Sequence, residues 1–129
     1  MKRNLFRNYE GLYVWQKSID FVAKVYKATE GFPSTEIYGL TNQIRRAVVS
    51  IPSNIAEESG RKGVKELLQF LHIALGSCSE LHTQFIIAKN LGYSQGNSLI
   101  DGILEIKKML IGYMNKVKKE GFGEEVATS

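Results

Sequence analysis

The sequence predicts an all-α protein built as an antiparallel, up-down-up-down four-helix bundle. Apolar residues recur at steps of three and four along four long stretches, and strand-like alternation is almost absent. Glycine and proline gather between these stretches, at residues 31–33, 60–63 and 92–96. Such short connections make neighbouring helices antiparallel, and a length of 129 residues fits a single domain, 1–129.

The first stretch predicts a helix at about residues 12–29. Its apolar face is predicted at Leu12, Trp15, Ile19, Val22 and Tyr26. Gly31 suits the end of a helix, and Pro33 prevents the helix from continuing.

The second stretch, about residues 36–59, carries a proline inside its helical pattern. Its apolar stripe is predicted at Leu40, Ile44, Val48, Ile51 and Ile55. Pro52 removes one amide donor, so the stretch is either one helix kinked at Pro52 or two helices that meet near Ile51. The apolar period continues through the proline, which favours the kinked helix.

The third and fourth stretches predict helices at about residues 64–90 and 97–119. Their apolar faces are broader than one interior stripe requires, because Ile73, Ile87, Leu104 and Ile111 lie beside the core positions. We therefore expect a homo-oligomer, with scattered exposed aliphatic residues as the alternative. Residues 1–8 are expected to form a loose basic arm and residues 121–129 a polar tail.

A polar stripe crosses the second helix. It is predicted at Gln43, Arg46, Ser50, Asn54 and Glu57, which are spaced three, four, four and three residues apart. Serine and asparagine are poor choices in the middle of an exposed helix, so a specific use is expected. Three uses stay open: a polar network against the third helix, in which Arg46 pairs with Glu80, a binding groove, or an oligomer contact.

No catalytic, metal or cofactor motif stands out. His72 and His82 fall on different helix faces, and no Glu-x-x-His pair of the kind that binds di-iron occurs. Cys78 is spaced as a core residue, and a single cysteine suits the reducing cytoplasm. No apolar run is long enough for a membrane span, and no small-molecule substrate is indicated. The sequence therefore predicts a non-enzymatic cytoplasmic protein.

Basic residues form several groups that are candidate contacts for nucleic acid. They are Lys17, Lys24 and Lys27 on the first helix, Arg61, Lys62 and Lys65 at the second connection, and Lys107 and Lys108 on the fourth helix. Each group alone is ordinary solvated charge, and the net charge of +4 is mild. Repeated around an oligomer, the groups would sum to a substantial positive field.

Several motifs together resemble one family, the four-helix-bundle proteins encoded by intervening sequences in bacterial 23S rRNA genes. The segments that carry the resemblance are YVWQK at 13–17, FP at 32–33 with Glu36, YGLT at 38–41, QIRRA at 43–47, SIPSNIAE at 50–57 and IALGS at 73–77. The resemblance implies an antiparallel four-helix bundle that assembles into ring-like pentamers. A similar fold serves as the accessory variability protein of diversity-generating retroelements, which works with nucleic acid.

The residues and the resemblance together predict a non-enzymatic, oligomeric bundle that contacts RNA or a ribonucleoprotein through basic surfaces. The alternative is a protein–protein interaction adaptor that does not bind nucleic acid. Binding that weakens steeply with salt would favour the first function, because phosphate contacts release counterions.

Overall fold

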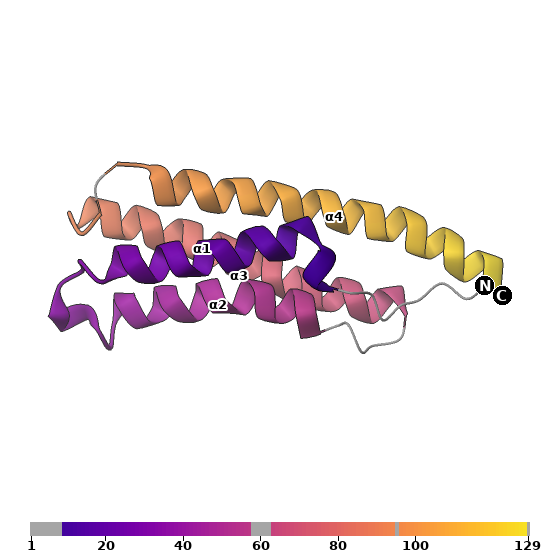
Figure 1. The fold of residues 1–129 in the computed structure, drawn as a ribbon, viewed down its shortest axis with the longest axis horizontal. Helices are drawn as coiled ribbons and strands as arrows, with labels where there is room; N and C mark the ends of the chain where they lie inside the picture. Colours follow the sequence, from indigo (N-terminus) through magenta and orange to yellow (C-terminus); the bar gives the residue numbers. More distant parts are fainter. Residues whose placement is uncertain (1–8, 58–62, 95, 129) are drawn as a thin grey trace.

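Four long helices follow one another around the bundle in chain order (Figure 1). The computed structural model describes residues 9–57, 63–94 and 96–128, of which 121–128 are described by their backbone alone. The elements are η1 (Tyr9–Gly11), α1 (Tyr13–Thr29), η2 (Ser34–Glu36), α2 (Leu40–Glu57), α3 (Val64–Asn90) and α4 (Ser98–Thr128). No strand occurs in these described ranges, so the predicted all-α bundle is confirmed.

Each helix packs against two neighbours, and one of the four seams is looser than the others. Helices α2 and α3 make the most extensive contact, followed by α3 with α4 and α1 with α2. The contact between α1 and α4 is the least extensive of the four. The four helices form a closed ring of neighbours, and the α1–α4 seam is the most open side of this ring.

The core consists of aliphatic side chains from all four helices, joined by an aromatic pair. Phe21 of α1 meets Phe85 of α3 edge to face, with ring centroids 6.1 Å apart. The fully buried aliphatic residues are Val25, Ile44, Val48, Ile51, Ile55, Leu71, Leu81, Ile103 and Leu110. Of the five positions of the stripe predicted on the second helix, the last four are thus confirmed as buried, and the first, Leu40, is half-buried against the core.

The apolar face predicted for the first helix is confirmed only in part: Leu12, Trp15 and Val22 are half-buried and pack against the core, but the centre of the buried face lies on other residues. The buried positions of α1 are Val14, Ser18, Phe21, Val25 and Thr29. Ile19 and Tyr26, predicted as core, are 41% and 40% exposed. The two polar core residues are tolerated because each hydroxyl bonds back to its own helix, Ser18 Oγ to the Trp15 carbonyl and Thr29 Oγ1 to the Val25 carbonyl, both at 2.8 Å.

Helix α2 begins later than predicted and runs through its proline as one helix. The chain forms the short helix η2 first, and α2 starts at Leu40 because the Glu36 carboxylate accepts a hydrogen bond from the Leu40 amide at 3.0 Å. Pro52 lies inside α2 and is buried. The interpretation as two helices is therefore wrong.

The predicted end of α3 is confirmed, and the predicted end of α4 is wrong. The range of α3 is as predicted, whereas α4 continues past Lys119 to Thr128 and projects beyond the other helices (Figure 1). The backbone of residues 121–128, expected as a polar tail, is helical. Extending an existing helix costs far less than starting one, and this outweighs the low helix propensity of Gly121 and Gly123. The basic arm at 1–8 lies outside the described residues.

Candidate functional site: the α1–α4 cleft

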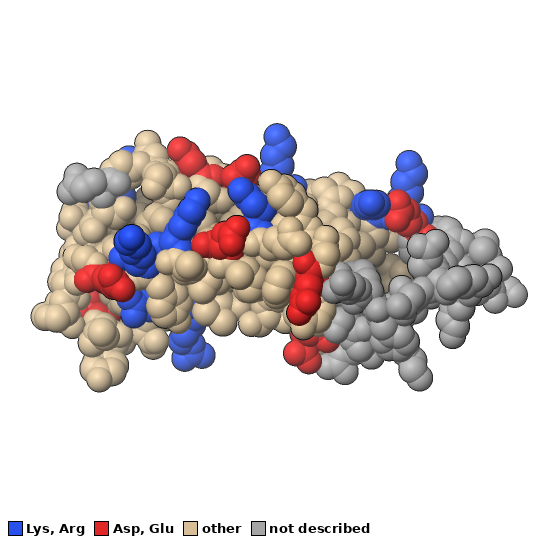
Figure 2. All heavy atoms as spheres, viewed as in Figure 1, with Lys and Arg blue, Asp and Glu red and all other residues tan. Residues whose placement is uncertain are grey.

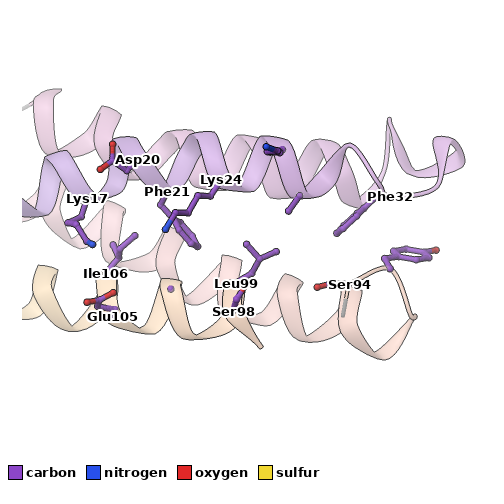
Figure 3. Close-up of a pocket in the computed structure, with 14 residues that line it drawn as sticks. Lys17, Asp20, Phe21, Lys24, Phe32, Ser94, Ser98, Leu99, Glu105 and Ile106 are labelled. Atoms are coloured by element: carbon purple, nitrogen blue, oxygen red, sulfur yellow. The ribbon is translucent and has the colours of Figure 1, made fainter. Parts of the chain in front are cut away.

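A cleft of about 660 Å³ lies at the loose seam between α1 and α4 (Figure 3). Helix α1 forms one wall, the first half of α4 forms the other, and the connection between α3 and α4 closes one end. The lining residues are Lys17, Asp20, Phe21, Lys24, Lys27, Ala28, Phe32, Tyr93, Ser94, Ser98, Leu99, Gly102, Glu105 and Ile106. The size falls in the range of about 300–1,000 Å³ that is typical of ligand pockets.

The floor of the cleft is apolar, and its shape depends on the absence of a side chain at Gly102. A Cβ atom built on Gly102 would lie 2.5 Å from Cε1 of Phe21, closer than real Cβ contacts come. The Phe21 ring therefore rests directly on the α4 backbone. Leu99 and Ile106, one turn before and after Gly102, complete the floor.

The rim on the α1 side is basic. Lys17, Lys24 and Lys27 line it. Lys17 Nζ lies 6.0 Å from the centroid of the exposed Tyr13 ring, and none of the three lysines takes part in an ion pair within the part of the chain that the structure describes. Figure 2 shows basic side chains gathered over this stretch of α1, with acidic ones between them. Lys24 extends toward α4, whereas the carboxylate of Asp20 points away from it (Figure 3). The structure thus brings three of the candidate nucleic-acid contacts to one cleft.

The closed end of the cleft is formed where the connection between α1 and α2 contacts the connection between α3 and α4, and we call this contact the clasp. The Tyr93 hydroxyl donates a 2.9 Å hydrogen bond to Oε2 of Glu36, and the Phe32 and Tyr93 ring centroids lie 5.6 Å apart. The bonds from the Leu40 amide and from Tyr93 lower the pKa of Glu36, and the same carboxylate raises the pKa of the Tyr93 hydroxyl. Gly39 leaves room for the bond at Leu40, since a Cβ there would lie 2.7 Å from Oε1 of Glu36. The clasp holds the closed end of the cleft in place.

The polar stripe divides into a half-buried part, Ser50 and Asn54, and an exposed part. Ser50 and Ser77 share a 2.8 Å hydrogen bond between α2 and α3, and the Asn54 amide donates to Oγ of Ser50 at 2.9 Å and to its carbonyl at 2.8 Å. Gln43, Arg46 and Glu57 are exposed. The middle of the stripe is therefore part of the α2–α3 seam.

The expected pair of Arg46 and Glu80 does not form in the described structure. Glu80 instead accepts a hydrogen bond from the Gln84 amide one turn along α3, at 3.2 Å. Arg46 points to a second, shallower hollow on the α1–α2 side, which it lines with Tyr26, Ile37, Tyr38, Thr41, Asn42, Arg45, Val49 and Ser50.

Arg45, which sequence reasoning passed over, ties α2 to the end of α1. Its guanidinium donates to Oγ1 of Thr29 at 2.9 Å and to the Tyr26 carbonyl at 3.2 Å, and it lies 4.6 Å from the centroid of the Tyr26 ring. A cation at this position complements the negative end of the α1 dipole. Sequence reasoning also passed over Gly102 and Tyr93. A glycine inside an apolar helix can signal close packing, but Gly112 of the same helix has open space around it, so the signal does not single out Gly102.

The other candidate contacts lie away from the cleft or outside the described residues. Lys65 is exposed near the start of α3, and Lys107 and Lys108 do not line the cleft. Arg61 and Lys62 lie outside the described residues. The cleft therefore collects only the α1 group.

The described residues offer little that resembles catalytic chemistry. They contain no group of three or more His, Cys, Asp or Glu side chains that could hold a metal ion. Burial raises the pKa of the Cys78 thiol to about 12, although the charge of Lys107 acts against this shift. Cys78 is thus a protonated core residue at neutral pH.

In the described part of the chain, no helix combines the length and the apolar character needed to cross a bilayer.

The four antiparallel helices around one aliphatic core define the chain as a four-helix-bundle protein. Residues 10–112 match a family model described as 23S rRNA-intervening sequence protein, and the chain belongs to this family. The resemblance found in the sequence is confirmed, and the matched range includes every residue that lines the cleft.

Comparison with solved structures supports the fold. A crystal structure of a protein of unknown function from the S23 ribosomal protein family of Bacteroides thetaiotaomicron VPI-5482 is similar, with a TM-score of 0.70. The two chains are 24% identical, and the alignment covers 78% of this chain and 97% of that one. At this identity the likeness shows the fold alone. Among functionally curated proteins, none matches the chain.

Proposed function

We propose that this protein is a non-enzymatic, oligomeric helical bundle that contacts RNA or a ribonucleoprotein through the basic rim of the α1–α4 cleft. The observation that carries the proposal is the row of Lys17, Lys24 and Lys27, which have no ion-pair partner among the described residues. Lysines that carry no internal ion pair are available to phosphate groups. The family description, which refers to 23S rRNA, and the net charge of +4 agree with this function. Cytoplasmic placement stays a prediction from the single cysteine.

The test is RNA binding measured by fluorescence anisotropy across a range of salt concentrations. Three phosphate contacts to a single strand give a slope of about −2 in the logarithm of affinity against the logarithm of salt concentration. The triple variant Lys17→Glu, Lys24→Glu, Lys27→Glu should lose most of this binding. A variant with the same charge change at exposed lysines of α4, Lys116→Glu, Lys118→Glu, Lys119→Glu, should retain clearly more. Equal losses in the two variants would mean that the cleft rim is not the contact surface.

The oligomeric part of the proposal rests on the outer surface of α3 and α4. Ile86, Leu104 and Ile111 are 39%, 40% and 40% exposed, and Gly112, in the middle of α4, has no atom within 4 Å of where its Cβ would lie. Exposed aliphatic side chains beside open helix backbone fit burial against another copy of the chain. A pentamer is the assembly that the family resemblance implies.

Sedimentation equilibrium at micromolar concentration tests the oligomer. The double variant Leu104→Glu, Ile111→Glu should dissociate the assembly, whereas Ile19→Glu on α1, at a residue of similar exposure (41%), should leave it intact. A wild-type protein that sediments as a monomer would contradict this part of the proposal.

A protein–protein adaptor is the second candidate function, and the same aliphatic surface favours it. An apolar interface depends weakly on salt, so the absence of salt-sensitive RNA binding together with salt-insensitive partner binding would establish the adaptor instead.

A further inference from the structure

We infer that the α1–α4 cleft takes up one unpaired nucleotide of an RNA strand, with the base against the apolar floor and the backbone phosphates on the α1 lysines. This inference rests on the proposed function and makes it more specific. A basic surface alone would bind any phosphate backbone, whereas a cleft with an apolar floor selects a base that has left its stack.

The floor is unsuited to a simple anion. Phe21 and Ile106 on the floor are 6% and 2% exposed and Phe32 at the closed end is 8% exposed, so the apolar surface of the cleft consists of the edges of buried aromatic and aliphatic groups. A phosphate or sulfate ion placed there would lose its hydration and gain no hydrogen-bond donor from these side chains. A flat heteroaromatic ring can fill the same space at no such cost, because its faces are apolar.

The rim provides the charge that the floor lacks. Lys17 and Lys24 are seven residues apart, which is about 10 Å along the helix axis, and Lys27 lies one turn further. The three lysines therefore follow one another along the α1 side of the cleft. A strand lying along α1 can place successive phosphates on them while one base turns inward.

Polar groups at the opposite wall complement the edge of a base or its ribose. The carboxylate of Glu105 and the hydroxyls of Ser94 and Ser98 line the cleft from the α4 side, across from the lysines (Figure 3). A carboxylate accepts hydrogen bonds from an exocyclic amino group or from a ribose 2′-hydroxyl, and a serine hydroxyl can donate or accept. The cleft thus offers an apolar floor, a cationic side and an acceptor side, which are the three parts of a nucleotide site.

The inference is tested by filling the cleft without changing its charge. Ala28→Phe places a ring in the cleft from an exposed position of α1, and Ala23→Phe makes the same change at an exposed position of the same helix outside the cleft. The probes are a labelled 12-nucleotide single-stranded RNA of mixed sequence and a duplex RNA of equal length. Circular dichroism melting of both variants checks that the full-length chain still folds.

Loss of one base packed on the apolar floor should lower the affinity of Ala28→Phe for the single strand about tenfold. Ala23→Phe should bind it as the wild type does, and duplex binding should be the same in all three proteins. This pattern supports the inference.

Other patterns overturn it. Single-strand binding that is insensitive to Ala28→Phe, with both RNAs still lost in the lysine triple variant, removes the nucleotide site but leaves the proposed function in place. A free nucleoside monophosphate that competes at the same concentration as the strand removes the assignment to RNA. Preferential binding to phosphatidylglycerol vesicles, reduced by Ala28→Phe, would make the occupant a lipid. No salt-sensitive binding to either RNA removes the proposed function itself.

Discussion

The two seams formed by α2–α3 and α1–α4 are built from similar helices but in opposite ways. At the α2–α3 seam, Ile51 and Leu81 are fully buried and the hydroxyls of Ser50 and Ser77 bond across the interface. At the α1–α4 seam, direct packing centres on one close approach, Phe21 on Gly102, and the rest opens into a cleft bordered by lysines. The packing that stabilises the fold is therefore concentrated at the α2–α3 seam, whereas the α1–α4 seam leaves polar and apolar side chains accessible to a ligand.

Truncating one leucine at each seam should show the largest difference. Leu81→Ala removes a fully buried side chain and is expected to lower the free energy of unfolding by about 2–5 kcal/mol. Leu99→Ala, at the half-buried cleft floor, should lower it by about 1 kcal/mol, because the space it vacates is already open to solvent. Urea denaturation of both variants measures the two values, and equal losses would contradict the contrast between the seams.

The close approach at Gly102 can be tested against a glycine of the same helix. Gly102→Ala forces a shift of the Phe21 ring, which packs on Phe85, and this overpacking should exceed the gain in helix propensity. Gly112→Ala meets no atom within 4 Å and should gain propensity alone. The two variants should therefore differ by about 2 kcal/mol in unfolding free energy. If Gly102→Ala is as stable as Gly112→Ala, the α1–α4 seam is more adaptable than the structure indicates.

The hydrogen bond across the α2–α3 seam should have a smaller effect. A double-mutant cycle of Ser50→Ala and Ser77→Ala should give a coupling energy of about 1 kcal/mol, because Ser50→Ala leaves the buried Ser77 hydroxyl without this partner, whereas Ser50 keeps its bond from Asn54 in Ser77→Ala. Ser53→Ala, at an exposed position of the same helix, should change stability little. A coupling energy near zero would mean that apolar packing alone holds this seam.

The clasp at the end of the cleft predicts a modest dependence of stability on pH. The folded-state pKa of Glu36 is lowered, so its contribution is present above the unfolded-state pKa and is lost as pH falls through the folded-state pKa. The drop in Tm between neutral and acidic pH should therefore be smaller in Glu36→Gln than in the wild type. Glu30→Gln, an exposed change at the end of α1, should leave the wild-type drop in place. A drop of equal size in Glu36→Gln would show that the carboxylate contributes nothing as a charged acceptor.

The sequence was a good guide where one apolar stripe stands alone. On α2, the residues Ile44, Val48, Ile51 and Ile55 form the only strongly apolar face, and all four are buried. On α1 two neighbouring stripes are both apolar, and the buried one contains Ser18 and Thr29. Periodicity cannot reveal that a hydroxyl will bond to its own helix, so it favours the more apolar stripe, whose residues Leu12, Trp15 and Val22 lie only at the margin of the core.

The candidate site was predictable in its charges but not in its shape. Lys17, Lys24 and Lys27 fall on one face of a helix whatever that helix packs against. Their position beside Leu99, Gly102 and Ile106 depends on how far α1 stands from α4, and spacing within one helix carries no such information. Likewise Arg46 lies three residues from Gln43 and four from Ser50 in the stripe, but the helix rotation that brings Ser50 against Ser77 of α3 leaves Arg46 in solvent.

The bond between Tyr93 and Glu36 has a consequence for the order of folding. It joins residues 57 positions apart, so it can form only after the first and second helical hairpins have docked. Closing so large a loop costs chain entropy that one hydrogen bond at the surface does not repay early. Tyr93→Phe should therefore speed unfolding and leave the refolding rate nearly unchanged, which makes this contact a marker of the last step in the assembly of the bundle.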